Sequence, residues 1–568
     1  MFDLESPSLD SSLRIDHLAS DASHCSLCRL LSLCRAKANL NSGDPLNFFR
    51  DDASHVLRSS PGGPPMISVY SDPAELFTAS GFVPKYAQYG VPYLPESPYR
   101  QFRLLKQWIR LCDTKHDCMS LNKIAATSKN MPTRVIDVRN DSIRLVETSN
   151  NTNDHYVALS HCWGKLKKEE RFCTYAHNID ALKIDIPYKA LPKTFQDAVT
   201  VTRALGVPYL WIDSLCIIQE DEKDWESEAT RMEEVFSSAY CTIAASRGTS
   251  SLSGFLGKRK HRPYTKVHTS GGPLYLAEAI DDFHTDVEQS ELSKRGWVLQ
   301  ERALSRRTIY FTATQIYWEC GQGIFCESLA ALRNPQSQVL SDSNFPVSSL
   351  KYHKDERIRL IQHINHTYSK LHLTMATDRP KAILGLQTRL ARAFESNVSY
   401  GIYERYLQRT LLWQAEEQGN LSRISYQDGR SPPSWSWMAY TGEIKYLEIP
   451  FEQVHWSGNP KSPFRFSGHE VQCDNRLHAE AKQLLLLFGE TELLSRVTID
   501  SKEYTFDQNS WRCIVVGKDK VANEDGEIVH YVLLVRSVSC APRTYERVGV
   551  GALLAGHISP VAESVFVI

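Results

Sequence analysis

The chain has 568 residues, and its 65 Lys and Arg residues nearly balance 66 Asp and Glu residues, which leaves a formal net charge of -1. With this balance, the net charge gives no indication of a nucleic-acid partner or of binding to an anionic membrane surface. No apolar run approaches the ~20 residues of a membrane span, and 14 scattered Cys without a secretory signal indicate reduced thiols in a cytoplasmic protein.

The order of polar, helical and strand-like segments predicts four regions. Residues 1–150 form an N-terminal Cys-containing region, 151–330 an α/β domain, 331–430 a helical region and 431–568 a β-rich C-terminal region. Alternating apolar residues over 307–320 predict a hairpin near the end of the α/β domain.

The N-terminal region holds a candidate structural zinc site. Cys25-x-x-Cys28 has zinc-finger spacing, and Cys112 and Cys118 supply a second pair, with His116 as an alternative ligand. The competing interpretation is a set of unconnected reduced cysteines, because nothing in the sequence brings the two pairs together.

Strands and helices alternate from residue 156 onward. We expect strands at 157–160, 207–212 and 241–245, with helices at 194–205 and 225–240 between them. This order predicts a mainly parallel sheet flanked by helices, and such sheets bind ligands beyond the carboxyl ends of their strands.

Small, polar and aromatic residues follow the first two strands, where a ligand would lie. Asp213 comes directly after an apolar strand and is a candidate catalytic acid, although it can also cap a turn. The candidate substrate-binding residues at these strand ends are Ser160, Trp163, Gly164 and Ser214.

One acidic residue of the 225–240 helix lies on its apolar face. Asp224 is the expected N-cap. Glu228 lies three residues after Trp225 and four before Met232, which places it inside the apolar stripe. A carboxylate there must be paired or have its pKa raised by desolvation.

Two roles for Glu228 remain open. It can form a structural ion pair with Arg231, Arg302 or another basic group. Alternatively, it stands at a pocket wall, where it bonds a substrate hydroxyl or transfers a proton.

Three blocks of the α/β domain carry a family resemblance. They are Tyr156–Gly164, the central stretch from Leu191 to Ser246, and Arg295–Ser305 with Gln315–Cys320. These blocks resemble the fungal heterokaryon-incompatibility (HET) domain family, with His161-Cys162 in place of a more usual Tyr-x pair. The flanks 108–118 and 433–437 are also similar to full-length proteins of that family.

The resemblance implies a role in fungal self/non-self recognition that ends in growth arrest or death of fused cells. HET domains are thought to be distant relatives of TIR domains, many of which cleave NAD with a glutamate shortly after a Trp. Trp225-x-x-Glu228 is similar to that arrangement, with one residue fewer between the pair.

By this resemblance Glu228 would stabilise the positive charge that develops on the ribose as nicotinamide leaves. Trp163 or Trp297 would stack on a planar base and Arg302 would pair with a phosphate. NAD is then a substrate, and the chemistry needs no further cofactor.

Two other functions are compatible with the same residues. A non-enzymatic module would transmit the incompatibility signal by self-association or by binding another incompatibility protein. A thiol hydrolase would use Cys216 as nucleophile with His161, although a buried Cys is commonly inert.

Overall fold

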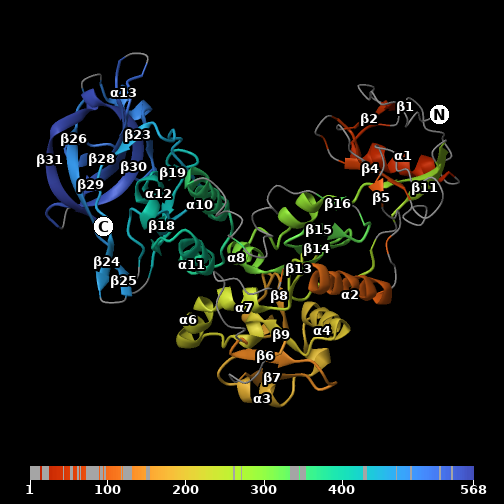
Figure 1. Cartoon of the computed structure of the whole chain (residues 1–568). Coiled ribbons are helices and arrows are strands. Elements are labelled where there is room, and N and C mark those ends of the chain that lie inside the picture. Colours follow the sequence, from red (N-terminus) through yellow and green to blue (C-terminus); the bar gives the residue numbers. More distant parts are fainter. Residues whose placement is uncertain are drawn as a thin grey trace. The chain divides into compact units, whose positions relative to one another are not determined.

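The structure is a computed structural model, and the described residues fall into two compact units. The first consists mainly of residues 1–293 and 301–344, and the second mainly of 345–568 with the short segment 294–300. The described residues are 13–15, 25–41, 44–50, 56–60, 63, 65–71, 88–89, 94, 98–116, 118, 131–148, 154–259, 262–269, 272–329, 331–332, 345, 354–426, 431–467, 470–486, 489–523, 526–538 and 541–568. Figure 1 shows the chain coloured along its sequence.

A nine-stranded sheet forms the centre of the first unit. Its order is β16-β15-β14-β13-β10-β8-β9-β6-β7. The strands are β6 (Arg134–Asp137), β7 (Arg144–Glu147), β8 (Tyr156–Ser160), β9 (Tyr209–Ile212), β10 (Cys241–Ala244), β13 (Arg307–Phe311), β14 (Ile316–Cys320), β15 (Gly323–Cys326) and β16 (Ala331–Leu332).

In this sheet, only the four central strands, β13, β10, β8 and β9, run parallel to one another. The hairpin β13–β14 and the remaining pairs at both edges are antiparallel. The expected mainly parallel sheet is therefore not confirmed, because short turns join the outer strands directly while helical crossovers join only the central ones. The broader α/β assignment and the hairpin are confirmed.

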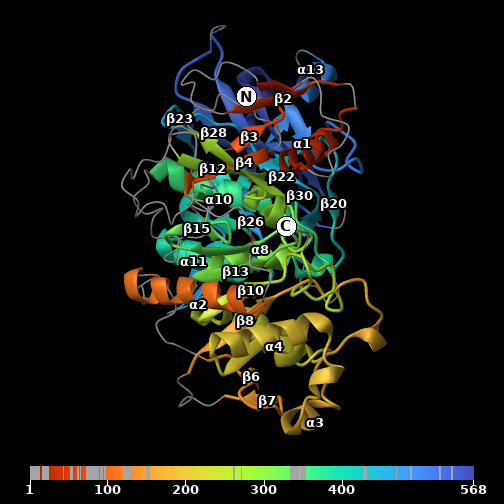
Figure 2. The same ribbon diagram turned by 90° about the vertical axis from the view of Figure 1, so that its right-hand side faces the viewer.

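Helices cover both faces of the central strands, as Figure 1 shows for α4 on one face and α6 with α7 on the other, and Figure 2 shows α4 in front of these strands. The helices are α3 (Ile179–Ile184), α4 (Lys193–Leu205), α5 (Asp213–Cys216), α6 (Glu222–Thr230), α7 (Met232–Ser238) and α8 (Gly296–Leu304). Every residue of β8, β9 and β10 is buried, as in parallel strands covered on both faces.

The order in which strands are added to the sheet reverses at β8. It passes from β8 to β9 on one side and then crosses back to β10 on the other. In folds with this change of strand order, successive helices lie on opposite faces and ligands bind in a crevice at the carboxyl ends of the strands. Residues that follow β8 and β9 therefore occupy the position where such folds bind ligands.

The predicted 225–240 helix is two helices. The Asp221 carboxylate caps the first by accepting from the backbone N–H groups of Lys223 and Asp224, and the two helices meet at Arg231. Asp224 is not the N-cap, because its carboxylate pairs with Arg134 at 2.5 Å. The expected boundary is wrong since Asp221 offers the same capping chemistry one turn earlier.

A second sheet of the first unit joins N-terminal strands to a hairpin from the middle of the chain. Strand β4 pairs with β12, which is followed along the sheet by β11. Its members are β1 (Leu13–Ile15), β2 (Leu46–Arg50), β3 (Val56–Arg58), β4 (Pro65–Ser71), β5 (Gln88–Tyr89), β11 (Tyr264–Thr269) and β12 (Gly272–Glu278). Helix α1 (Ser26–Lys37) shares a core with this sheet through Leu30 and Leu31.

The second unit contains helices and a largely antiparallel seven-stranded sheet, so the β-rich C-terminal region is confirmed. Its helices are α10 (Lys354–Ser369), α11 (Leu384–Ala393), α12 (Leu407–Leu411) and α13 (Glu490–Ser495). The sheet strands are β23 (Val454–Trp456), β26 (Leu477–Leu484), β27 (Val497–Ile499), β28 (Trp511–Asp519), β29 (Val529–Ser537), β30 (Thr544–Leu554) and β31 (Ile558–Val567). The boundaries of the four predicted regions stay a prediction.

Two-residue and other short strand pairs complete the second unit. They are β17 (Val398–Ser399) with β18 (Ile402–Tyr403), β19 (Trp413–Ala415) with β22 (Ile444–Tyr446), β20 (Ser422–Arg423) with β21 (Tyr440–Thr441), and β24 (Phe464–Ser467) with β25 (Glu470–Cys473). Within the part of the chain that the structure describes, no helix has the length and apolar character needed to cross a membrane.

Candidate functional site

The polar residues at the carboxyl ends of β8 and β9 converge on Asp213. One carboxylate oxygen accepts a hydrogen bond from the Trp163 indole at 2.7 Å, and the other accepts from the Ser214 backbone N–H at 2.7 Å. The His161 Nδ1 lies 3.9 Å from the Asp213 Oδ1. The Asp213 side chain keeps 27% of its surface exposed, whereas that of His161 keeps 2%. Asp213 is therefore oriented by its neighbours and still open to solvent.

A second acid joins this edge of the sheet. The buried Ser160 hydroxyl donates a hydrogen bond to the Glu301 Oε2 of helix α8. Sequence reasoning did not select Glu301, although it stands next to Arg302 in the third block. Beside these groups the buried Ser214 Oγ has no hydrogen-bond partner among the described residues.

Glu228 is buried, with 3% of its surface exposed, as its place in the apolar stripe predicted. Its carboxylate accepts a hydrogen bond from the Thr133 hydroxyl at 2.5 Å and lies 3.9 Å from the Arg231 guanidinium. Arg231 in turn donates to the Thr133 hydroxyl oxygen. Glu228, Thr133 and Arg231 therefore contact one another. This arrangement corresponds to the structural ion pair with Arg231, one of the two roles that the sequence allowed for Glu228.

The region that holds these residues matches a known protein family. The family model described as heterokaryon incompatibility protein (HET) matches residues 156–301. Residues 156–301 are therefore similar to a HET domain. No curated protein and no solved structure matches the chain. The matched range begins at the first residue of β8 and ends at Glu301, so it contains the whole cluster around Asp213 and Ser160.

Gly164, within the matched range, has a structural reason to be glycine. Its φ is +85°, and a Cβ at this position would lie 2.3 Å from the Ser250 Cβ. A side chain would therefore be strained and would collide with the segment after β10. The predicted contact of Gly164 with a substrate stays a prediction.

Arg302, the residue directly after the matched range, is held by two acids. Its guanidinium contacts both carboxylate oxygens of Glu319, at 3.1 and 2.9 Å, and lies 3.4 Å from Glu288. The Arg302 side chain is only 9% exposed. This geometry makes Arg302 part of a buried ion pair and leaves its predicted phosphate contact without direct support.

Trp297 belongs to the second unit and has a partner within it. Its indole forms a hydrogen bond with Asp378, whose pKa is raised by burial despite this bond. The indole N–H is thus engaged with protein, and the predicted stacking of Trp297 on a base stays a prediction.

The thiol-hydrolase alternative meets an unfavourable environment. Burial raises the pKa of the Cys216 thiol to about 12. A thiol nucleophile needs the opposite shift, because only the thiolate attacks. The ring of His161 packs edge-on against Phe195, with 5.1 Å between their centroids.

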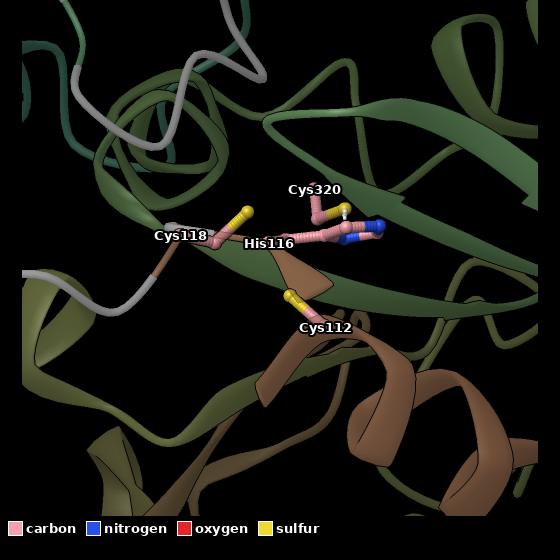
Figure 3. Close-up of side chains that lie close together, drawn as sticks. All are labelled: Cys112, His116, Cys118 and Cys320. Carbon is pink, nitrogen blue, oxygen red and sulfur yellow. Dashed lines mark hydrogen bonds between the residues drawn. The ribbon is translucent and has the colours of Figure 1, made fainter. Parts of the chain in front are cut away.

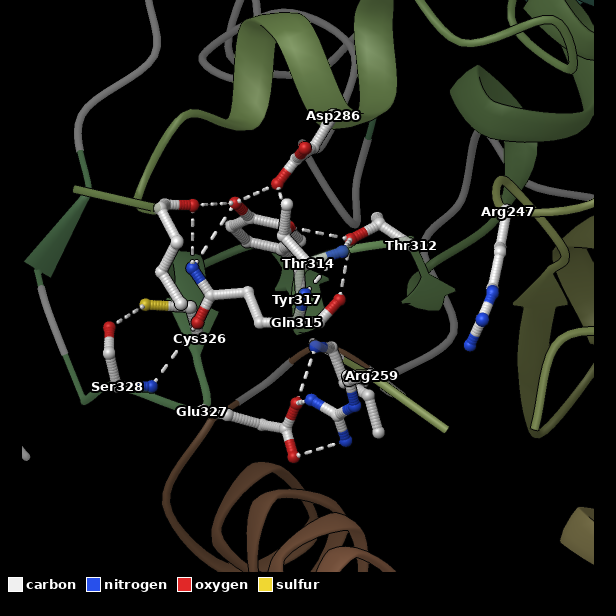
Figure 4. A network of polar contacts seen from close by, with 12 residues as sticks. Arg247, Arg259, Asp286, Thr312, Thr314, Gln315, Tyr317, Cys326, Glu327 and Ser328 are labelled. Carbon is white, nitrogen blue, oxygen red and sulfur yellow. Dashed lines mark hydrogen bonds and ion pairs between the residues drawn. The ribbon is translucent and has the colours of Figure 1, made fainter. Parts of the chain in front are cut away.

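The third block continues into a polar network that Figure 4 shows. The Gln315 amide nitrogen donates to Asp281 at 2.9 Å, and its amide oxygen accepts from the Ser328 backbone N–H. Tyr317 donates to Asp286 at 2.7 Å, and Thr314 donates to the same carboxylate oxygen. These residues connect β14 to neighbouring loops.

We expect Asp286 to make the stability of the first unit depend on pH. Burial raises the pKa of Asp286 to about 6, so the folded chain binds this proton more tightly than the unfolded chain. The free energy of unfolding should therefore decrease as pH rises from about 4 to about 6, by up to about 3 kcal/mol. Asp286→Asn should remove that slope and stabilise the unit above pH ~6, as measured by denaturant unfolding across this range.

Asp180, whose side chain is 94% exposed, provides the control for this measurement. Asp180→Asn should leave the slope intact. A slope that persists in Asp286→Asn would assign the effect to another group.

The cysteines group differently from the predicted zinc ligands. Cys112, His116, Cys118 and Cys320 lie together, with all ligand atoms within 4.8 Å of one another. Cys25 is the N-cap of α1, where its sulfur accepts from the Cys28 backbone N–H. Of the predicted zinc ligands, the structure therefore brings Cys112, Cys118 and His116 together and adds Cys320, whereas Cys25 and Cys28 lie at the start of α1 and are not part of this cluster.

Proposed function

We propose that this protein is an effector of fungal heterokaryon incompatibility whose HET domain cleaves NAD or a related nucleotide at the Asp213 edge of the sheet. The family supports an incompatibility role in general. The proposal moves the central carboxylate from Glu228 to Asp213, since Glu228 is engaged by Thr133 and Arg231.

The observation that carries the proposal is the position of the Asp213 carboxylate. It is partly exposed beyond a parallel strand and is held in place by the Trp163 indole and the Ser214 N–H. A pre-oriented carboxylate can stabilise the positive charge that develops on ribose when the glycosidic bond to nicotinamide breaks. The buried Ser160–Glu301 pair lies at the end of the adjacent strand β8 and makes this edge of the sheet polar beside Asp213.

A non-enzymatic interaction module is the second candidate. It is favoured by the closed contacts of Glu228, because the residue that resembles the TIR glutamate has a structural partner here. In that case Asp213 and Trp163 would shape a binding surface.

The experiment expresses the full chain in a fungal host and measures NAD, free nicotinamide and cell survival. Asp213→Asn should lower NAD cleavage about 100-fold or more, because it removes a charge used in the transition state. Glu228→Gln should keep cleavage within about threefold of wild type, because its amide oxygen still accepts from Thr133.

Full NAD cleavage by Asp213→Asn would refute the proposed site. Survival restored by Asp213→Asn, with NAD unchanged by the wild-type chain, would favour the interaction module. Cleavage lost in Glu228→Gln and kept in Asp213→Asn would return the central role to Glu228.

A further inference from the structure

Four potential metal ligands meet outside the region that matches the HET family. Cys112 lies in the last turns of helix α2 (Pro98–Lys115), His116 follows the helix directly, and Cys118 comes two residues later. Cys320 is the final residue of β14. Figure 3 shows the three sulfur atoms and the imidazole directed toward a common space.

The distances fit one small tetrahedral cation. The Cys320 Sγ lies 3.6 Å from the His116 Nδ1, and every pair of ligand atoms lies within 4.8 Å. Tetrahedral zinc, with bonds of about 2.3 Å to sulfur and about 2.0 Å to nitrogen, separates a sulfur and a nitrogen ligand by about 3.6 Å and two sulfurs by about 3.8 Å.

We propose that Cys112, His116, Cys118 and Cys320 form a structural Zn²⁺ site. Three thiolates and one imidazole are a closed ligand set for zinc, with no coordination position left for water. Thiolate ligands also disfavour magnesium and calcium, which prefer oxygen. The three cysteines are buried, so the metal lies within the fold.

The surrounding contacts prepare this site before any metal binds. Residues 112 and 116 are four positions apart at the end of a helix, which places them on one face. Asp113 between them accepts from Arg307 at 2.5 Å and from the Tyr240 hydroxyl at 2.7 Å. These bonds hold the end of α2 against the sheet near β14, and the metal would fix two segments 204 residues apart in sequence.

A disulfide explains the cluster less completely. One disulfide among Cys112, Cys118 and Cys320 would leave the third thiol unpaired. It would also give no reason for the His116 Nδ1 to face the Cys320 sulfur. Zinc uses all four groups.

The test is metal analysis of the full chain purified without added metal and under reducing conditions. We expect about one zinc per chain in the wild type, as a four-ligand structural site requires. Cys320→Ser should lose most of it. His116→Cys should retain zinc, because four thiolates also form a tetrahedral site. The control Cys25→Ser/Cys28→Ser should stay fully loaded, since neither residue belongs to the cluster.

Cobalt exchange tests the wild-type chain without dependence on a variant that folds. Co²⁺ bound by three thiolates should give the visible absorption of a tetrahedral thiolate complex, and a chelator that removes the metal should lower the unfolding temperature. Absence of stoichiometric zinc and of the cobalt spectrum would overturn the proposal. A disulfide within the cluster in the freshly isolated chain, zinc retained by Cys320→Ser, or zinc lost from Cys25→Ser/Cys28→Ser would also overturn it.

Discussion

Arg547→Met is expected to destabilise the second unit by about 3–5 kcal/mol, because it leaves a buried carboxylate without its partner. The side chains of Arg547 and Asp500 are both fully buried and pair at 2.9 Å. Arg547 also donates to the backbone carbonyls of Leu411 and Trp413, and its guanidinium lies over the Trp413 ring. Denaturant unfolding followed by tryptophan fluorescence measures the shift.

A matched exposed pair supplies the control for Arg547. Arg465 contacts Asp474 at 2.8 Å, but its side chain is 73% exposed. Arg465→Met should therefore cost no more than about 1 kcal/mol. The double change Arg547→Met/Asp500→Leu should recover part of the loss by removing the stranded charge. If Arg547→Met and Arg465→Met lower the free energy of unfolding by the same amount, burial of the ion pair does not determine its contribution to stability.

Arg302→Met is expected to destabilise the first unit by about 3–5 kcal/mol, because Glu319 and Glu288 would lose their common buried partner. Glu319 is 3% exposed at its side chain and also accepts from the Tyr310 hydroxyl. Glu319→Gln should be destabilising as well, since it weakens the same contact. Thermal and denaturant unfolding of the full chain give the comparison.

The Arg302 variant also separates a structural role from the predicted phosphate contact. A phosphate ligand role alone predicts loss of NAD cleavage or cell death with little change in stability. The exposed pair of Lys168 and Glu220, with side chains 61% and 60% exposed, provides a control through Lys168→Met. If Arg302→Met unfolds at the same denaturant concentration as Lys168→Met, the ion pair does not support the fold.

Local sequence patterns predicted that the Glu228 side chain is buried, but they did not predict which residue it contacts. Helical spacing places it among apolar residues, and this information lies within a few turns of one helix. The Thr133 hydroxyl that it contacts is 95 residues away. Because the partner depends on how β6 packs beside α6, the sequence left the ion pair and the pocket wall as equal alternatives.

For the nine-stranded sheet as well, the sequence predicted some features and the tertiary structure decided others. Alternating strands and helices predicted the parallel strands β8, β9 and β10, since a crossover helix joins each to the next. The hairpin at 307–320 was predicted, but the attachment of the antiparallel edge strands to the same sheet was not. Edge pairing depends on which apolar face meets which neighbour, and apolar character alone does not specify that choice.

By itself, the sequence determined the buried strands, the acid at the end of β9 and the inward position of Glu228, because each depends on neighbours close along the chain. Only the tertiary structure decided that Glu301 meets Ser160, that Arg302 meets Glu319, and that Cys320 meets Cys112. Such long-range contacts depend on how complete helices and sheets pack against one another. Short-range periodicity carries little information about this packing.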